Sequence, residues 1–140
     1  MRGIVAKVGE RTQEPSHSRS IDALRGDAVT DLDLLMRSAA ALRTQLRIFE
    51  TALRKPHRLL DRGGPTADLP KAIDIISVRE TLTQAAVDFE TARHASRLSI
   101  FRLQLAEGMS LGAIARAWGF SRQLVSRMLK DDRPDPPNES

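Results

Sequence analysis

Residues 110–130 read SLGAIARAWGFSRQLVSRMLK, and this stretch decides the fold. Ser110 and Ser121 each stand where a helix can begin, because a serine hydroxyl accepts a hydrogen bond from a free backbone N–H of the first turn. Gly119 lies between them, and glycine tolerates the positive φ at which many helices end. The stretch therefore predicts a short helix on each side of a tight turn. The three segments are 111–118, 119–121 and 122–130.

The apolar side chains of this stretch are spaced so that the two helices can pack across a steep corner. The small residue Ala115 allows the second helix to cross closely, and the β-branched Val125 fills the space opposite. The predicted core consists of Ile114, Trp118, Leu124, Val125 and either Met128 or Leu129.

With Ala115, Gly119 and Val125 in these places, the segment resembles the helix-turn-helix family of bacterial and phage regulators. The resemblance covers about twenty residues and extends loosely to the helix before them, as in three-helix modules of that family. It implies that residues 121–130 form a recognition helix that enters the major groove of double-stranded DNA.

The resemblance also assigns roles to the outward side chains of this module. Arg122 and Gln123, near the N-terminal end of the recognition helix, are expected to contact guanine and adenine edges. The remaining outward residues are expected to reach phosphates, with one arginine contributed by the supporting helix. These phosphate candidates are Ser121, Ser126, Arg127, Lys130 and Arg116.

The charge distribution agrees with an anionic partner. The chain has a net charge of +4, but residues 91–130 alone hold seven Arg and Lys against one acid, Glu107. Most of these bases are arginines, which can bind a phosphate or a guanine edge through two parallel hydrogen bonds.

Further upstream, two long segments carry apolar residues spaced alternately three and four apart, as along a coiled-coil seam. The first covers 28–53, and Pro56 is expected to end its helix at Lys55, because the residue before a proline is pushed out of the helical region. The second covers 75–92. A loop over 57–70, rich in glycine and proline, is predicted between them.

Two such helices predict an antiparallel hairpin, whose thin core would be completed by a second copy of the chain. The residues expected to form that homodimer interface are Leu35, Leu42, Leu46 and Phe49. The predicted organisation is all-α. Its parts are a flexible N-terminal arm (1–26), a dimerising helical hairpin (27–95), a helix-turn-helix module (96–130) and a disordered tail (131–140).

The sequence lacks the residues that several classes of function require. The chain has no cysteine, and His17, His57 and His94 stand too far apart in sequence for metal-ligand spacing. Neither a glycine-rich phosphate loop nor a nucleophile elbow is present. We therefore expect no metal, no cofactor and no enzymatic activity. The lack of a long apolar run or a secretory signal predicts a cytoplasmic protein that does not enter a membrane.

The resulting expectation is a sequence-specific transcriptional regulator that binds DNA as a homodimer, as a repressor rather than an activator. Two other readings stay open. One is an architectural or partition-type protein that binds DNA with little sequence preference. The other is an adaptor whose C-terminal helices dock on the transcription machinery.

Overall fold

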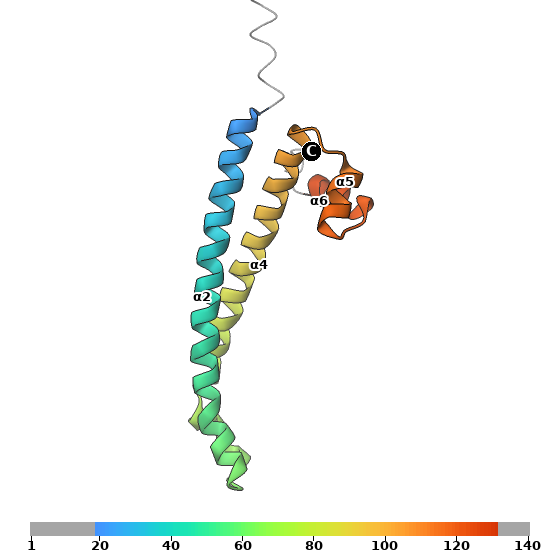
Figure 1. The fold of residues 1–140 in the computed structure, drawn as a ribbon. Coiled ribbons are helices and arrows are strands. Elements are labelled where there is room, and N and C mark those ends of the chain that lie inside the picture. The colour runs from blue at the N-terminus through green and yellow to red at the C-terminus, as the bar shows by residue number, and fades with distance from the viewer. Residues whose placement is uncertain (1–18, 132–140) are drawn as a thin grey trace, which may run out of the picture. The chain divides into compact units, whose positions relative to one another are not determined.

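The computed structural model describes residues 19–131, and this part of the chain is all-helical, with no strand. This confirms the predicted all-α class. The elements are α2 (Ile21–Asp61), the 3-10 turn η2 (Thr66–Asp68), α3 (Leu69–Ala72), α4 (Ile75–Ala106), α5 (Leu111–Trp118) and α6 (Arg122–Asp131), shown in Figure 1.

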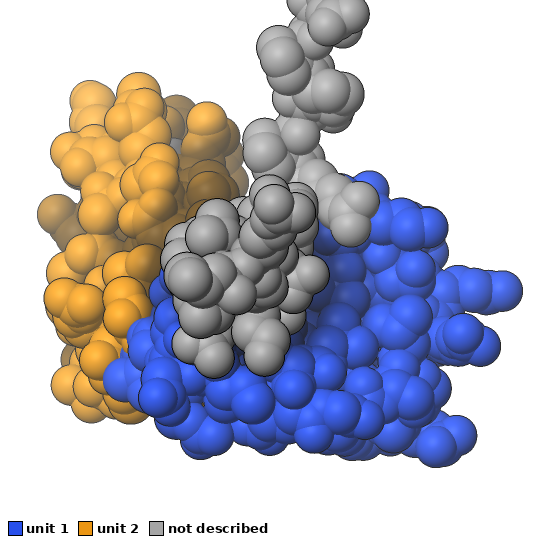
Figure 2. All heavy atoms as spheres, turned by 90° about the horizontal axis from the view of Figure 1, so that it is seen from above, with its two compact units in different colours: residues 1–29, 97–140 blue, residues 30–96 orange. Residues whose placement is uncertain are grey.

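The chain divides into two compact units, coloured separately in Figure 2. Unit 1 comprises residues 1–29 and 97–140, of which 19–29 and 97–131 are described. Unit 2 comprises residues 30–96. Both α2 and α4 pass from one unit into the other without a break in the helix, so each unit contains part of each long helix.

The helix α2 begins earlier than the sequence suggested. The predicted flexible arm over 1–26 is wrong for its last residues, which are helical from Ile21 onward, and residues 1–18 lie outside the described part of the chain. The Ser20 hydroxyl accepts a hydrogen bond from the Ala23 N–H at 3.1 Å and caps the helix. Leu24 and Ala28 are buried in unit 1, so this first turn is held by packing as well as by its cap.

The same helix also ends later than predicted, because Pro56 does not stop it. A proline inside a helix has no N–H for the carbonyl four residues earlier, but its fixed φ is compatible with helical geometry. Here the ring is buried, and the helix continues to Asp61. The end comes at Gly63, with a φ of 77°. The N–H of Gly64 then donates to the carbonyl of Leu59 at 2.8 Å and closes the last turn.

Between the long helices, the expected loop over 57–70 is partly helical. It begins with the last turn of α2 and contains η2 and the start of α3, a single turn with proline near its beginning. The backbone extends at Ile73, and the Asp74 carboxylate accepts a hydrogen bond from the Ser77 N–H at 3.3 Å near the start of α4.

Unit 2 has little buried core. Its half-buried apolar residues follow the predicted spacing of three and four on α4, but on α2 only every second residue of the predicted seam is half-buried and the others are exposed. On α2 they include Leu35, Leu42 and Phe49, and on α4 they include Val78, Leu82 and Phe89. Side chains of both helices line one hollow of about 420 Å³, which includes Phe49, Leu53, Val78 and Leu82.

No helix within residues 19–131 is both long enough and apolar enough to cross a lipid bilayer.

Candidate nucleic-acid interface

The helix α5 forms as its flanking residues predict. Ser110 has an extended backbone, and its hydroxyl accepts a hydrogen bond from the Ala113 N–H at 3.1 Å. At the other end, Gly119 adopts a left-handed conformation with a φ of 73° and a ψ of 27°. The N–H of Phe120 donates to the Ala115 carbonyl at 2.9 Å, which closes the helix. The predicted bounds of 111–118 are confirmed.

The helix α6 follows after a turn of three residues. The Ser121 hydroxyl accepts a hydrogen bond from the Leu124 N–H at 3.1 Å, and the Ser121 carbonyl accepts one from the Val125 N–H at 3.2 Å. Ser121 therefore caps α6 as expected. The helix includes Asp131, so the predicted disordered tail over 131–140 is wrong at its first residue; residues 132–140 lie outside the described part of the chain.

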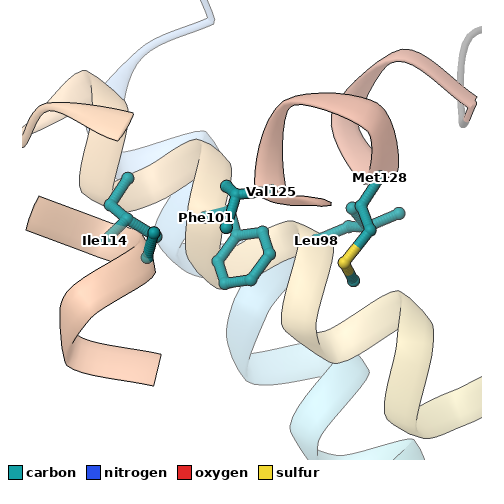
Figure 3. Close-up of a cluster of buried hydrophobic side chains, with 6 residues drawn as sticks. Leu98, Phe101, Ile114, Val125 and Met128 are labelled. Carbon is teal, nitrogen blue, oxygen red and sulfur yellow. The ribbon is translucent and has the colours of Figure 1, made fainter. Parts of the chain in front are cut away.

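The two short helices share a core with the end of α4, drawn in Figure 3. Its fully buried side chains are Leu98 and Phe101 of α4, Ile114 of α5 and Val125 of α6. Ala115 is 3% exposed, so a larger side chain there would collide with its surroundings. Of the predicted core residues, Ile114, Val125 and Met128 are buried. Trp118, Leu124 and Leu129 are partly buried and pack against the cluster.

Trp118 connects α5 to α4. Its ring meets that of Phe101 edge to face, with 5.2 Å between centroids and 89° between planes. Its indole N–H donates a hydrogen bond to the Gln104 side-chain oxygen at 3.3 Å. Aromatic pairs favour this edge-to-face geometry, and a partly buried indole N–H needs an acceptor. The large residue therefore holds α5 on α4 and does not disturb the fold.

The residues expected to contact DNA lie almost entirely on the exposed surface of these two short helices. Ser126 is half-buried, while the other six are exposed: Arg116, Ser121, Arg122, Gln123, Arg127 and Lys130. Residues 111–130 contain four bases and no acid. The outer face of α5 and α6 is thus polar and cationic, opposite the apolar side that packs in the core.

No described residue pairs with the four cations of this surface. Arg116, Arg122, Arg127 and Lys130 form no ion pair or side-chain hydrogen bond with any other residue of the described 19–131. Two described acids lie near them in sequence: Asp131 is exposed at the end of α6, and Glu107 accepts a hydrogen bond from Arg25 at 3.0 Å. Within residues 19–131, no acid pairs directly with these four cations, so their donors can bind an anion.

A further arginine lies at the turn and was not expected from the sequence. The Arg97 guanidinium of α4 lies over the Phe120 ring, 5.2 Å from its centroid. This places another positive charge beside the turn between α5 and α6, in a cation–π contact. The two residues are far apart in sequence, and no local pattern signals their contact.

The residues expected to form the dimer interface do not share one environment. Leu35, Leu42 and Phe49 are half-buried within unit 2, whereas Leu46 is 44% exposed.

The described residues include no group of three or more histidine or carboxylate side chains that could hold a metal ion. His17 lies outside the described residues.

The regular secondary structure of the described part of unit 1 thus consists of helices alone, in which α5 and α6 pack on the end of α4 and present exposed cations. Comparison with models of protein families, with curated protein sequences and with solved structures gave no match.

Proposed function

We propose that the chain is a sequence-specific DNA-binding protein of the helix-turn-helix type, acting as a transcriptional repressor. In this proposal α5 supports α6, and α6 enters the major groove. The observation that carries it is the outer face of α5 and α6, where four exposed cations have no partner among the described residues and no acid occurs before Asp131 at the end of α6.

A cationic face without a bound anion has an unfavourable electrostatic energy. Exposed arginines close together repel one another, and an anion that binds them relieves this repulsion. A duplex offers regularly spaced phosphates, and the counterions released from it add to the free energy of binding. The major groove is wide enough for a helix, and Arg122 and Gln123 stand in its first turn, where base edges come within reach.

The proposal extends to the arrangement of the chain. We propose that α2 and α4 form an antiparallel hairpin and that two copies associate, because one recognition helix covers too few base pairs for useful affinity. The shared hollow lined by Phe49, Leu53, Val78 and Leu82 supports the pairing of the two helices within unit 2.

In vitro selection from a library of random duplexes tests the proposal, followed by titration of the selected duplex. Replacing Arg122, Arg127 and Lys130 together with alanine should weaken binding by at least about a hundredfold, since a bidentate base contact alone contributes about 1–3 kcal/mol. A matched variant removes the same charge from unit 2 by replacing the exposed Arg37, Arg58 and Arg79.

The matched variant should bind the selected duplex within about threefold of the wild type. Equal losses in the two variants would show that only net charge matters, as expected for an architectural protein. A selection that enriches no sequence while the protein remains folded would contradict the proposal. Binding to random duplexes would then favour an architectural protein, and no binding would favour an adaptor.

A further inference from the structure

Unit 2 buries little apolar surface. Among its residues, 30–96, the buried side chains are Pro56, Ala92 and Ser96. Several large apolar side chains of α2 are instead exposed, from 39% at Leu32 to 62% at Met36. A contiguous exposed apolar surface on a folded unit usually marks an interaction site.

Five of the seven exposed large apolar side chains of α2 in unit 2 lie on one line along the helix, and Leu34 and Ile48 lie outside it. The half-buried residues Leu35, Leu42 and Phe49 recur every seven residues. A second series with the same period consists of Leu32, Ala39, Leu46, Leu53 and Leu60. The second series is exposed throughout. Met36, Arg43, Glu50 and His57 each lie four residues after a member of this series and fill the gaps between its members. We call the resulting continuous strip the outer stripe. Its members are Leu32, Met36, Ala39, Arg43, Leu46, Glu50, Leu53, His57 and Leu60.

We propose that the outer stripe binds the outer stripe of a second copy, with the two α2 helices antiparallel. The inference takes up the proposed homodimer and adds the surface and the direction of the pairing. It does not depend on DNA binding.

The direction follows from the two charged residues in the middle of the stripe. Arg43 and Glu50 are both exposed, and neither forms an ion pair or side-chain hydrogen bond with another described residue of 19–131. In a parallel pair in register, Arg43 would face Arg43 of the second copy, and Glu50 would face Glu50. In an antiparallel pair centred between Leu46 and Arg47, each Arg43 faces Glu50 of the other copy. Opposite charges then meet twice, and the like-charge contacts are avoided.

The apolar members fit the same register. Around that centre, Leu32 lies within one residue of the position opposite Leu60, and Ala39 lies within one residue of the position opposite Leu53. A small residue against a large one lets two helices approach and interdigitate. Because Arg43 meets Glu50, Ala39 lies near Leu53 and Leu32 lies near Leu60, a second copy of the chain matches the stripe in both charge and apolar character.

Charge exchange tests the pairing, with sedimentation velocity as the readout and no DNA present. Arg43→Glu and Glu50→Arg should each raise the dissociation constant of the dimer by about tenfold or more, because each creates two like-charge contacts. The double variant Arg43→Glu/Glu50→Arg should return to within about threefold of the wild type. The control Arg37→Glu makes the same charge change on α2 outside the stripe and should leave association unchanged.

Single cysteines test the direction independently, since the chain has none of its own. Under mild oxidation Leu46→Cys should form a disulfide-linked dimer with itself. Met36→Cys and His57→Cys should each stay unlinked alone and form a mixed dimer when combined. Self-linking of Met36→Cys would show a parallel pair and overturn the proposal, as would a double charge variant weaker than both single ones. Since no DNA is used, loss of the proposed DNA binding would leave these results untouched.

Discussion

At the scale of single residues, Gly112 within α5 and Gly119 at its end differ in backbone conformation. Gly119 ends the helix with a φ of 73°, and a Cβ there would meet nothing within 4 Å. Gly112 lies inside the helix, where a Cβ would meet only the Arg116 Nη1 and Ser110 Oγ atoms at 3.9 Å. The cost of a side chain at either position is therefore conformational and not steric.

The same substitution should consequently have opposite signs at these two positions. Gly119→Ala should lower the free energy of unfolding by about 1 kcal/mol, because alanine disfavours left-handed backbone. Gly112→Ala should raise it by up to about 1 kcal/mol, because alanine is the better helix former. Urea denaturation of the two variants measures both values. A stabilised Gly119→Ala variant would contradict the assigned helix end.

Two cations of α6 should differ in what they contribute to DNA binding. Arg122→Ala should cost about 1–3 kcal/mol on a selected site and much less on random DNA, as expected for a base contact. Lys130→Ala should weaken binding to both and lower the slope of log K against log salt by about one, because it removes one phosphate contact. Fluorescence anisotropy at several salt concentrations gives both quantities. An Arg122→Ala variant equally weakened on both duplexes would remove Arg122 from base recognition.

Much of this site could be predicted because its signals are local. Ser110, Gly119 and Ser121 act on backbone groups within a few residues of themselves, so their roles can be read from neighbours in sequence. The contacts of Phe101 with Trp118 and of Arg97 with Phe120 could not be predicted in this way. They depend on how α4 packs against the short helices, and no spacing rule links residues so far apart.

At the scale of helices, the errors lie at the two ends of α2. The polar residues before Ile21 favoured a flexible arm, yet Ser20 caps the helix and Leu24 is buried. Pro56 was expected to end the helix because a proline disfavours helical geometry at the residue before it, but this preference is outweighed here, where the ring is buried and the helix continues to Asp61. The true end follows from Gly63, whose positive φ most other residues avoid.

The packing of this first turn gives a direct test. Leu24→Ala should lower the free energy of unfolding by about 2–4 kcal/mol, because it leaves a cavity around a side chain that is 8% exposed. Ile21→Ala, one turn earlier on the same helix, removes a side chain that is 42% exposed and should cost less than about 1 kcal/mol. Thermal denaturation measures the difference. Equal effects of the two substitutions would contradict the packing of Leu24 and favour a flexible arm over these residues.

At the scale of the whole molecule, the two faces of α2 are proposed to serve different contacts. Leu42 belongs to the half-buried series, and Leu46 belongs to the outer stripe. The sequence placed both in one dimer interface, because residues four apart on a helix lie on neighbouring lines and spacing alone does not separate them.

A charge at these two leucines should therefore have different consequences. Leu46→Glu should give a helical protein that associates at least about tenfold more weakly. Leu42→Glu should reduce helicity and melting temperature, because it places a charge inside unit 2. Circular dichroism and sedimentation velocity distinguish the two outcomes. Loss of helicity in Leu46→Glu with none in Leu42→Glu would reverse the assignment of the faces.

Whether the cationic face of α5 and α6 reads a DNA sequence is decided most directly by one ratio. The dissociation constants of the wild-type chain are measured for a selected duplex and for a random duplex of equal length, at the same physiological salt. A sequence-specific regulator should prefer the selected duplex by at least about a thousandfold. Equal affinity for the two duplexes, or no binding to either, would contradict the proposed function.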